Sequence, residues 1–357
     1  MLMYYEIHWR ISMEDRSFFL YDMWNEIARD HKPKLSFRHA GMSFDEWHKA
    51  AHEKLLDLLG DFPEKIDLDP VVEYSELQGD YIRQRVIINA DKYMKIPCYV
   101  LIPANRKPGE RLPAIVCSHG HGPYGKDPVA GVLGDGAHAA EIAKMNYNYA
   151  EQMAKEGFVT IAPDLRGFGE RHEYIEASVS TGRDLCNINF IKGALFGIYP
   201  MTLNIWDIRR CIDYLETMDE VDPDRIGMMG LSYGGTITTF ATAVEPRIKA
   251  ADIIGYVNPF AEFAIKRANF CGSQIVPNLY KYFDTYDIAG LIAPRPLLLE
   301  MGLFDHCFYY KDLHQGYLGT KEIYDAAGLT DLLHTDIHPG GHQFSGKVAP
   351  DFFKKYL

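Results

Sequence analysis

Near the middle of the chain an apolar run leads into a glycine-rich turn, Ile226-Gly227-Met228-Met229-Gly230-Leu231-Ser232-Tyr233-Gly234-Gly235. The turn contains the pattern Gly-x-Ser-x-Gly. An apolar run that ends in this pattern and continues into small residues is typical of a nucleophile elbow, a sharp strand-to-helix turn that lifts a serine hydroxyl above a sheet. The glycines let strand and helix approach closely, and Ser232 takes a strained backbone conformation. The alternative is a glycine-rich turn that holds an ordinary serine.

Short apolar runs alternate with helical patterns from Pro103 onward. The predicted strands are Ala114–Ser118, Val159–Pro163, Ile226–Gly230, Ala250–Gly255, Leu297–Met301 and Leu333–His338, and the helical patterns include Tyr149–Lys155, Leu203–Thr217 and Lys321–Ala327. The segment after Ser232 is also predicted as helix, although Thr236–Thr239 have better strand propensity. This alternation predicts an α/β fold with a doubly wound, mostly parallel sheet that binds ligands at the carboxyl ends of its strands.

Residues 1–80 have a helical pattern. Ser43 and Glu46 are spaced for a capping box, and Gly60 supplies a stop. Between them, apolar residues recur at helical spacing at Trp47, Ala51, Leu55 and Leu58. We therefore expect a helical N-terminal extension over residues 1–80, packed on a main domain over residues 81–357.

The main domain is predicted to open with an antiparallel pair of strands, over residues 81–88 and 96–102, because apolar and polar residues alternate in the first of them. Two long excursions, near residues 171–200 and 258–294, interrupt the later strands and are candidate lids. The second is rich in aromatic residues, namely Phe260, Phe263, Phe270, Tyr280, Tyr282, Phe283 and Tyr286. These rings suit either the lining of a pocket or the packing of the excursion on the core.

A nucleophilic serine needs a base that takes its proton. The segment His338-Pro339-Gly340-Gly341-His342 follows the last predicted strand. Its two glycines let the loop bend back over the sheet toward Ser232. We predict His342 as the base, because His338 still belongs to the strand end.

The base in turn needs a carboxylate that orients the imidazole. Asp305 follows the predicted strand Leu297–Met301 and gives the order serine, aspartate, histidine along the chain. The loop after the preceding strand contains no acid before Glu262, and Glu300 lies inside a strand. We therefore predict Asp305 as the acid of a Ser232, Asp305, His342 triad.

Acyl transfer also needs N–H groups that stabilise a developing oxyanion. The backbone of Tyr233, directly after Ser232, is one expected donor. The loop His119-Gly120-His121-Gly122 follows the first parallel strand, and we predict His121 as the second donor. In a competing interpretation His119 and His121 bind a metal. We expect no metal, because no carboxylate partner such as that of HExxH accompanies the pair.

Several segments together resemble the α/β-hydrolase superfamily, namely Ser118-His119-Gly120-His121-Gly122, Ala162–Gly169, Gly230–Gly235, Ala293-Pro294-Arg295-Pro296 and His338–His342. Within the superfamily, the chain resembles acetyl xylan esterases and dienelactone-hydrolase-like esterases. The resemblance extends from about Val86 to the C-terminus and implies an α/β-hydrolase catalytic domain over residues 81–357. The turn Gly-x-Ser-Tyr-Gly-Gly is also similar to that of prolyl-oligopeptidase-type peptidases.

The composition of the chain excludes some classes of binding partner. The chain has 357 residues and a formal net charge of −12, with 37 Lys and Arg against 49 Asp and Glu, which argues against nucleic acid or an acidic membrane as the main partner. The N-terminal residues lack the pattern of a signal peptide, and the six cysteines form no CxxC pair. We expect a cytoplasmic protein with no membrane partner. The sequence is compatible with a homo-oligomer as well as with a monomer.

These features predict a serine-dependent carboxylic ester hydrolase that works through an acyl-enzyme and needs no cofactor. The expected substrate is a small molecule with a short-chain acyl ester, such as an acetylated carbohydrate or an aryl ester. Two alternatives remain open. One is a serine peptidase or amidase related to prolyl-oligopeptidase catalytic domains, and the other is a non-catalytic binding protein.

Overall fold

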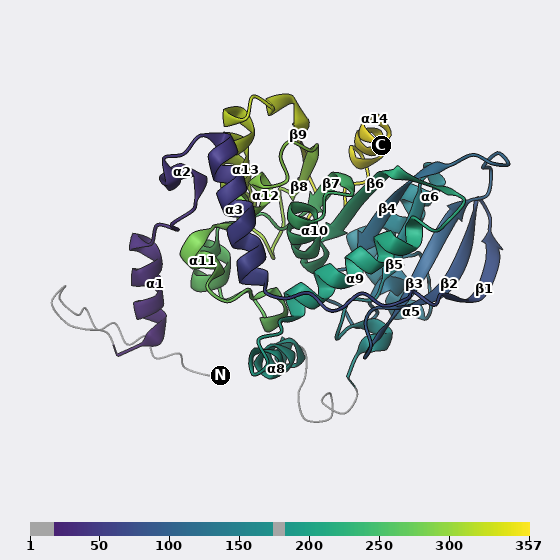
Figure 1. Cartoon of the computed structure of the whole chain (residues 1–357), viewed down its shortest axis with the longest axis horizontal. Coiled ribbons are helices and arrows are strands. Elements are labelled where there is room, and N and C mark those ends of the chain that lie inside the picture. Colours follow the sequence, from purple (N-terminus) through teal and green to yellow (C-terminus); the bar gives the residue numbers. More distant parts are fainter. Residues whose placement is uncertain (1–17, 174–182) are drawn as a thin grey trace, which may run out of the picture.

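The structure is a computed structural model that describes residues 18–173 and 183–357. The predictions for residues 1–17 of the N-terminal extension and for residues 174–182 of the first excursion lie outside these residues. Figure 1 shows a twisted sheet that runs through the molecule, with helices on both of its faces.

In the described part of the chain the sheet has nine strands in the order β1-β2-β3-β5-β4-β6-β7-β8-β9 (Figure 1). Their bounds are β1 Val71–Gln78, β2 Tyr81–Asn89, β3 Lys95–Pro103, β4 Leu112–Ser118, β5 Val159–Pro163, β6 Val221–Leu231, β7 Ile248–Ile254, β8 Leu297–Gly302 and β9 Leu333–His338. The pairs β1–β2, β2–β3 and β3–β5 are antiparallel, and the pairs from β5–β4 through to β8–β9 are parallel. The predicted doubly wound, mostly parallel sheet is confirmed.

Helices cover both faces of this sheet. The α-helices are α1 Leu20–Asp30, α2 Phe37–Ala40, α3 Phe44–Leu59, α4 Lys126–Val129, α5 Gly136–Met145, α6 Tyr149–Lys155, α8 Arg183–Ala194, α9 Pro200–Leu215, α10 Tyr233–Val244, α11 Leu279–Tyr282, α12 Thr285–Gly290, α13 Tyr310–Ala326 and α14 Ala349–Tyr356. Short 3₁₀ turns are η1 Gly169–Arg171, η3 Gly272–Gln274 and η4 Thr330–Leu332, and η2 Ala261–Lys266 is a π-helix.

Strand β4 illustrates why the central strands are largely apolar. Its side chains alternate between the two faces, as in any strand. Ala114 and Val116 pack in the cluster that contains residues of α3, α9 and α10. Ile115 and Cys117 pack in the cluster that contains residues of α6 and α14. A strand buried on both faces carries a continuous apolar run, and this makes the central strands recognisable in the sequence.

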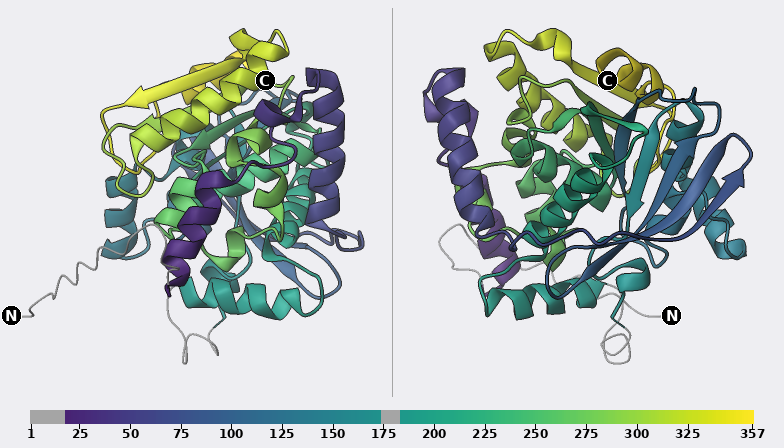
Figure 2. Two further views of the ribbon diagram at one scale, coloured as in Figure 1. Left: turned by 90° about the vertical axis from the view of Figure 1, so that its left-hand side faces the viewer. Right: turned by 45° about the vertical axis from the view of Figure 1, so that its right-hand side comes forward.

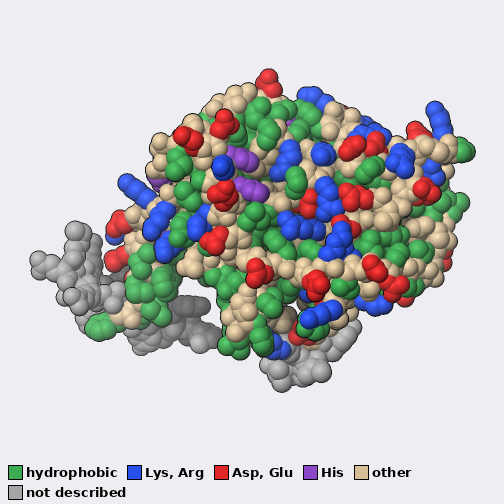
Figure 3. Space-filling model, in the orientation of Figure 1, with side chains coloured by type: hydrophobic (Ala, Val, Ile, Leu, Met, Phe, Trp, Pro, Cys, Tyr) green, Lys and Arg blue, Asp and Glu red, His purple; other side chains and the backbone are tan. Residues whose placement is uncertain are grey.

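The described part of the N-terminal extension contains α1, α2 and α3. The predicted capping box opens α3, because Ser43 Oγ accepts the Glu46 N–H at 3.5 Å and the Glu46 carboxylate accepts the Ser43 N–H at 3.1 Å. Trp47, Ala51 and Leu55 are fully buried in the core, as the helical spacing predicts. By contrast, α1 has no buried residue, and its region carries exposed hydrophobic side chains at the lower left of Figure 3.

The prediction that residues up to 80 are helical is wrong at its end, because Val71–Gln78 form β1. Among the described strands it lies at the edge of the sheet and pairs only with β2. Most of its side chains are exposed, so the sequence has no apolar alternation that would reveal a strand.

The two excursions pack against each other. The first contributes α8, and the second contributes η2, η3, α11 and α12 (Figures 1 and 2). Gly272 in η3 donates its N–H to Asn187 Oδ1 of α8 at 2.8 Å. A Cβ on Gly272 would lie 2.5 Å from Cβ of Phe190 and 2.6 Å from the carbonyl oxygen of Cys186. The described excursions therefore form one packed unit, held by a close approach that only glycine permits.

Candidate active site

Ser232 lies at a sharp turn between β6 and α10. Its backbone has φ 63° and ψ −117°, a conformation that is costly for a residue with a side chain. Its N–H donates to the carbonyl oxygen of Ile254 in β7 at 3.0 Å, which fixes the turn against the neighbouring strand. The strand-turn-helix geometry predicted for the pentapeptide is present.

The glycines of the pentapeptide have a steric cause. A Cβ on Gly234 would lie 2.0 Å from the carbonyl oxygen of Ser118, and a Cβ on Gly230 would lie 2.5 Å from the carbonyl carbon of Gly234. Neither contact is possible for a real side chain. Glycine is therefore required at both positions for α10 to begin directly above β4 and β6.

Helix α10 forms despite the strand propensity of its threonines. All of its residues from Tyr233 to Val244 are buried. The hydroxyls of Thr238 and Thr239 donate to the carbonyl oxygens of Gly234 and Gly235, one turn earlier, at 2.8 and 2.7 Å. Bonds of this kind satisfy buried hydroxyls inside a helix, and burial outweighs the weak local preference.

His342 and Asp305 meet on the loops that follow β9 and β8. His342 Nδ1 lies 2.8 Å from Asp305 Oδ2. The other oxygen, Oδ1, accepts the N–H groups of Cys307 and Phe308 at 2.7 and 2.8 Å. The carboxylate is thereby fixed by its own loop, and its free oxygen points at the imidazole. The ring of His342 also stacks on Phe308, with centroids 5.5 Å apart.

Ser232 and His342 open onto one cavity of about 260 Å³. Its lining consists of Gly120, His121, Lys144, Met145, Tyr147, Leu231, Ser232, Phe263, Asn269, Gln274, His306, Cys307, Phe308 and His342. Phe263 is the aromatic residue of the second excursion that reaches this cavity. Phe260, Phe270 and Tyr280 instead line a separate cavity of about 140 Å³, and Phe283 is fully buried. Some of these rings therefore line a pocket, as Phe263 does, while others, such as Phe283, pack the excursion on the core.

The predicted oxyanion donors flank Ser232. Tyr233 is the first residue of α10, and His121 lies on the loop after β4, with its ring 4.7 Å from that of Tyr233. Within the described residues, neither backbone N–H donates to another protein group. A Cβ on Gly120 would lie 3.2 Å from Cβ of Ser232, so this loop approaches the elbow closely. The loop that carries His121 therefore lies directly beside the turn that carries Ser232.

His119 takes no part in this cavity. It is fully buried, its Nδ1 lies 2.7 Å from the carbonyl oxygen of Gly120, and its Nε2 accepts the Leu165 N–H at 3.0 Å. Burial lowers the pKa of His119 to about 4. Because both ring nitrogens are used, His119 and His121 do not act as a metal-binding pair.

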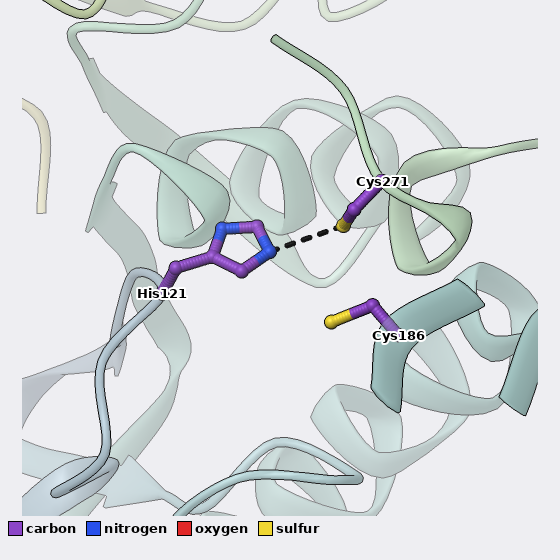
Figure 4. Close-up of side chains that lie close together, drawn as sticks. All are labelled: His121, Cys186 and Cys271. Carbon is purple, nitrogen blue, oxygen red and sulfur yellow. Dashed lines mark hydrogen bonds between the residues drawn. The ribbon is translucent and has the colours of Figure 1, made fainter. Parts of the chain in front are cut away.

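His121 has a different neighbour, which the sequence did not reveal. Its Nε2 lies 3.1 Å from Cys271 Sγ, and Cys186 lies beside them (Figure 4). Hydrogen bonding from Cys186, followed by that from His121, lowers the pKa of the Cys271 thiol to about 4. These residues are far apart along the chain and fit no spacing motif, so only the fold brings them together.

The rival acids lie elsewhere. Glu262 pairs with Lys266 Nζ at 3.2 Å within η2. Glu300 is buried inside β8, where its Oε2 accepts the Ser345 N–H at 2.9 Å and burial raises its pKa to about 8. His338 Nδ1 accepts the Gly340 N–H at 3.2 Å. Neither Glu300 nor His338 lines the cavity that contains Ser232.

The mostly parallel nine-stranded sheet with helices on both faces is the fold of an α/β-hydrolase. The model of the Abhydrolase family matches residues 5–317, and the chain belongs to this family. The chain is 25% identical over 310 residues to "Putative hydrolase YtaP" of Bacillus subtilis, an alignment that covers 85% of this chain and 98% of that protein.

Solved structures share the fold. A "putative acetyl xylan esterase" from Bacteroides fragilis has a TM-score of 0.73 at 19% identity, covering 96% of this chain and 86% of that chain. A glucuronoyl esterase from Solibacter usitatus has a TM-score of 0.64 at 16% identity, covering 88% of this chain and 93% of that chain. At these identities the likeness concerns the fold.

Among the described helices, none is both long and apolar enough to cross a bilayer.

Proposed function

We propose that the protein is a serine-dependent carboxylic ester hydrolase, with Ser232 as nucleophile, His342 as general base and Asp305 as the acid that orients it. The observation that carries this proposal is the bond of 2.8 Å between His342 Nδ1 and Asp305 Oδ2. His342 lines the same cavity as Ser232. With Nδ1 engaged, the other ring nitrogen, Nε2, is left for proton transfer.

In the first half of the reaction, Ser232 Oγ attacks the ester carbonyl carbon while its proton passes to His342 Nε2. The carbonyl oxygen becomes an oxyanion, which accepts hydrogen bonds from the backbone N–H groups of Tyr233 and His121. Collapse of the tetrahedral intermediate breaks the bond to the alcohol. The alcohol leaves with the proton from His342, and the acyl group stays on Ser232.

In the second half, a water molecule attacks the acyl carbon and gives a proton to His342. The second tetrahedral intermediate collapses, Ser232 Oγ takes back the proton from His342, and the carboxylic acid is released. Throughout, the negative charge of Asp305 stabilises the imidazolium form of His342. The carboxylate of Asp305 is already held by two backbone N–H groups, which lowers the reorganisation that the reaction requires.

We further propose short-chain acyl esters, such as acetylated carbohydrates or aryl esters, as substrates. The cavity of about 260 Å³ suits a small acyl group, and Phe263 and Phe308 supply flat apolar walls for a sugar or aryl ring. The names of the similar structures, an acetyl xylan esterase and a glucuronoyl esterase, are those of enzymes that act on carbohydrate esters.

All six cysteines are free thiols, which supports a reducing compartment such as the cytoplasm.

A substrate panel tests the proposal. Purified protein is assayed on p-nitrophenyl esters of increasing acyl length, acetylated xylose, methyl glucuronate and aminoacyl p-nitroanilides. We expect kcat/KM to be highest for acetyl esters and at least about tenfold lower for the anilides, a difference of about 1.4 kcal/mol in transition-state stabilisation. Faster cleavage of the anilides than of any ester would contradict the proposal and favour a peptidase.

A further inference from the structure

His121 belongs to a group of three side chains of types that can bind a metal ion. His121 Nε2, Cys186 Sγ and Cys271 Sγ lie within 4.8 Å of one another. They come from the loop after β4, from α8 in the first excursion and from the segment before η3 in the second. Figure 4 shows the imidazole and both sulfur atoms directed into one shared space.

The spacing of these atoms suits a tetrahedral metal ion. Zinc binds thiolate sulfur at about 2.3 Å and imidazole nitrogen at about 2.0 Å, so ligand atoms around one tetrahedral ion lie about 3.5 to 3.8 Å apart. The separation of His121 Nε2 from Cys271 Sγ is 3.1 Å, and no pair exceeds 4.8 Å. Small side-chain movements bring all three atoms to the required separation.

The surroundings hold the ligands in place. Cys186 and Cys271 are 6% and 3% exposed. The side-chain amide of Gln274 donates to Cys271 Sγ at 3.7 Å, a bond that supports a thiolate. The ring of His121 is held edge-on by Phe168, with centroids 5.4 Å apart. His121 and Gln274 also line the cavity, so the cluster lies directly beside it.

We propose that His121, Cys186 and Cys271 bind one Zn²⁺ ion, with a water molecule from the cavity as its fourth ligand. Two thiolates and one imidazole are a ligand set that favours zinc over magnesium or calcium, which prefer oxygen. Binding displaces the proton of any ligand thiol that is not already ionised. This site goes beyond the proposed esterase reaction, which needs no metal.

The ion would join three segments that already meet through the bond from Gly272 N–H to Asn187 Oδ1 and the contact of His121 Nε2 with Cys271 Sγ. It ties α8 and the segment before η3 to the loop that carries His121, which approaches Ser232 closely. The zinc is thus a positioning element for the excursions and the oxyanion loop, and it takes no part in bond cleavage.

The first test uses the metal alone. Protein that has been stripped with a chelator and kept in a phosphine reductant is titrated with Zn²⁺ and separately with Co²⁺. We expect about one zinc ion per chain with a Kd below about 1 μM. The Co²⁺ form should show a near-ultraviolet thiolate-to-cobalt charge-transfer band together with the visible bands of tetrahedral cobalt, and zinc should raise Tm.

Variants assign the site. Cys186→Ser, Cys271→Ser and His121→Gln should each reduce bound zinc from about one ion per chain to near zero and remove the cobalt charge-transfer band. Two matched controls should keep both signals. Cys211→Ala changes a buried thiol on α9 outside the cluster, and Cys307→Ser disrupts the neighbouring group Asp305, His306 and Cys307. Circular dichroism identifies any variant that fails to fold, and the wild-type cobalt spectrum does not depend on the variants.

Three results overturn the proposal. Reduced wild-type protein that binds no zinc, or binds cobalt without a charge-transfer band, rules out the thiolate site. Loss of zinc in Cys307→Ser, with retention in Cys271→Ser, moves the metal to the other cluster. Rapid formation of a Cys186–Cys271 disulfide in place of metal binding, detected by peptide mass mapping without reductant, together with no zinc uptake under reductant, assigns the pair to redox chemistry.

Discussion

The carboxylate of Asp305 meets His342 with only one of its two oxygens. Oδ2 lies 2.8 Å from His342 Nδ1, while Oδ1 accepts two backbone N–H groups of its own loop. The geometry fixes which oxygen has which role. The backbone N–H groups of Cys307 and Phe308 are donors, so the atom that faces them must be an acceptor. This relationship makes the effect of an amide substitution at residue 305 predictable.

In Asp305→Asn, the amide oxygen should take the place of Oδ1, since an NH₂ group there would face two N–H donors. The NH₂ group would then face His342 Nδ1 and impose the wrong tautomer. We expect kcat on an activated acetate ester to fall by about 10³ to 10⁴ with little change in KM. The control is Glu262→Gln, which removes an ion pair with Lys266 outside the cavity and should leave kcat nearly unchanged. An impaired Glu262 variant beside an active Asp305 variant would assign the acid to the other loop.

The pentapeptide glycines should matter for stability as well as for chemistry. In Gly234→Ala, the new methyl would lie 2.0 Å from the carbonyl oxygen of Ser118, so α10 must move away from β4. We expect the free energy of unfolding in urea to fall by about 1 to 3 kcal/mol or more. Gly136→Ala is the matched control, because a Cβ at this first residue of α5 meets nothing within 4 Å. Equal stability of the two variants would refute the steric account of the elbow.

A buried carboxyl below the site should make stability depend on pH. Burial, together with the charge of Asp336, raises the pKa of Glu300 to about 8, well above the value of about 4.3 for an unfolded glutamate. Between these values the folded state holds more protons than the unfolded state, so the free energy of unfolding should fall as pH rises from about 5 to 8. Glu300→Gln should flatten this slope, measured by urea unfolding across the range.

The control for this pH experiment is Glu53→Gln, which removes an exposed carboxyl on α3 and should leave the slope as in the wild type. A Glu300→Gln protein whose stability falls with pH as steeply as that of the wild type would show that groups other than Glu300 cause the pH dependence.

Much of this fold could be predicted from the sequence for physical reasons. The central parallel strands are buried on both faces, so their apolar runs stand out, and the elbow has a steric requirement for glycine that leaves a fixed pattern. The edge strand β1 cannot be recognised in the sequence, because most of its side chains are exposed and need not be apolar. The cluster of His121, Cys186 and Cys271 was missed because its members lie on separate segments.

The central claim is that Ser232 carries the acyl group, and one comparison tests it most directly. Wild-type protein and Ser232→Ala are assayed on p-nitrophenyl acetate after both are shown to have the same Tm, since the substitution leaves the elbow glycines in place. We predict that kcat falls by about 10⁴ to 10⁶ in Ser232→Ala. A folded Ser232→Ala protein that keeps more than a few per cent of the wild-type activity would contradict the account.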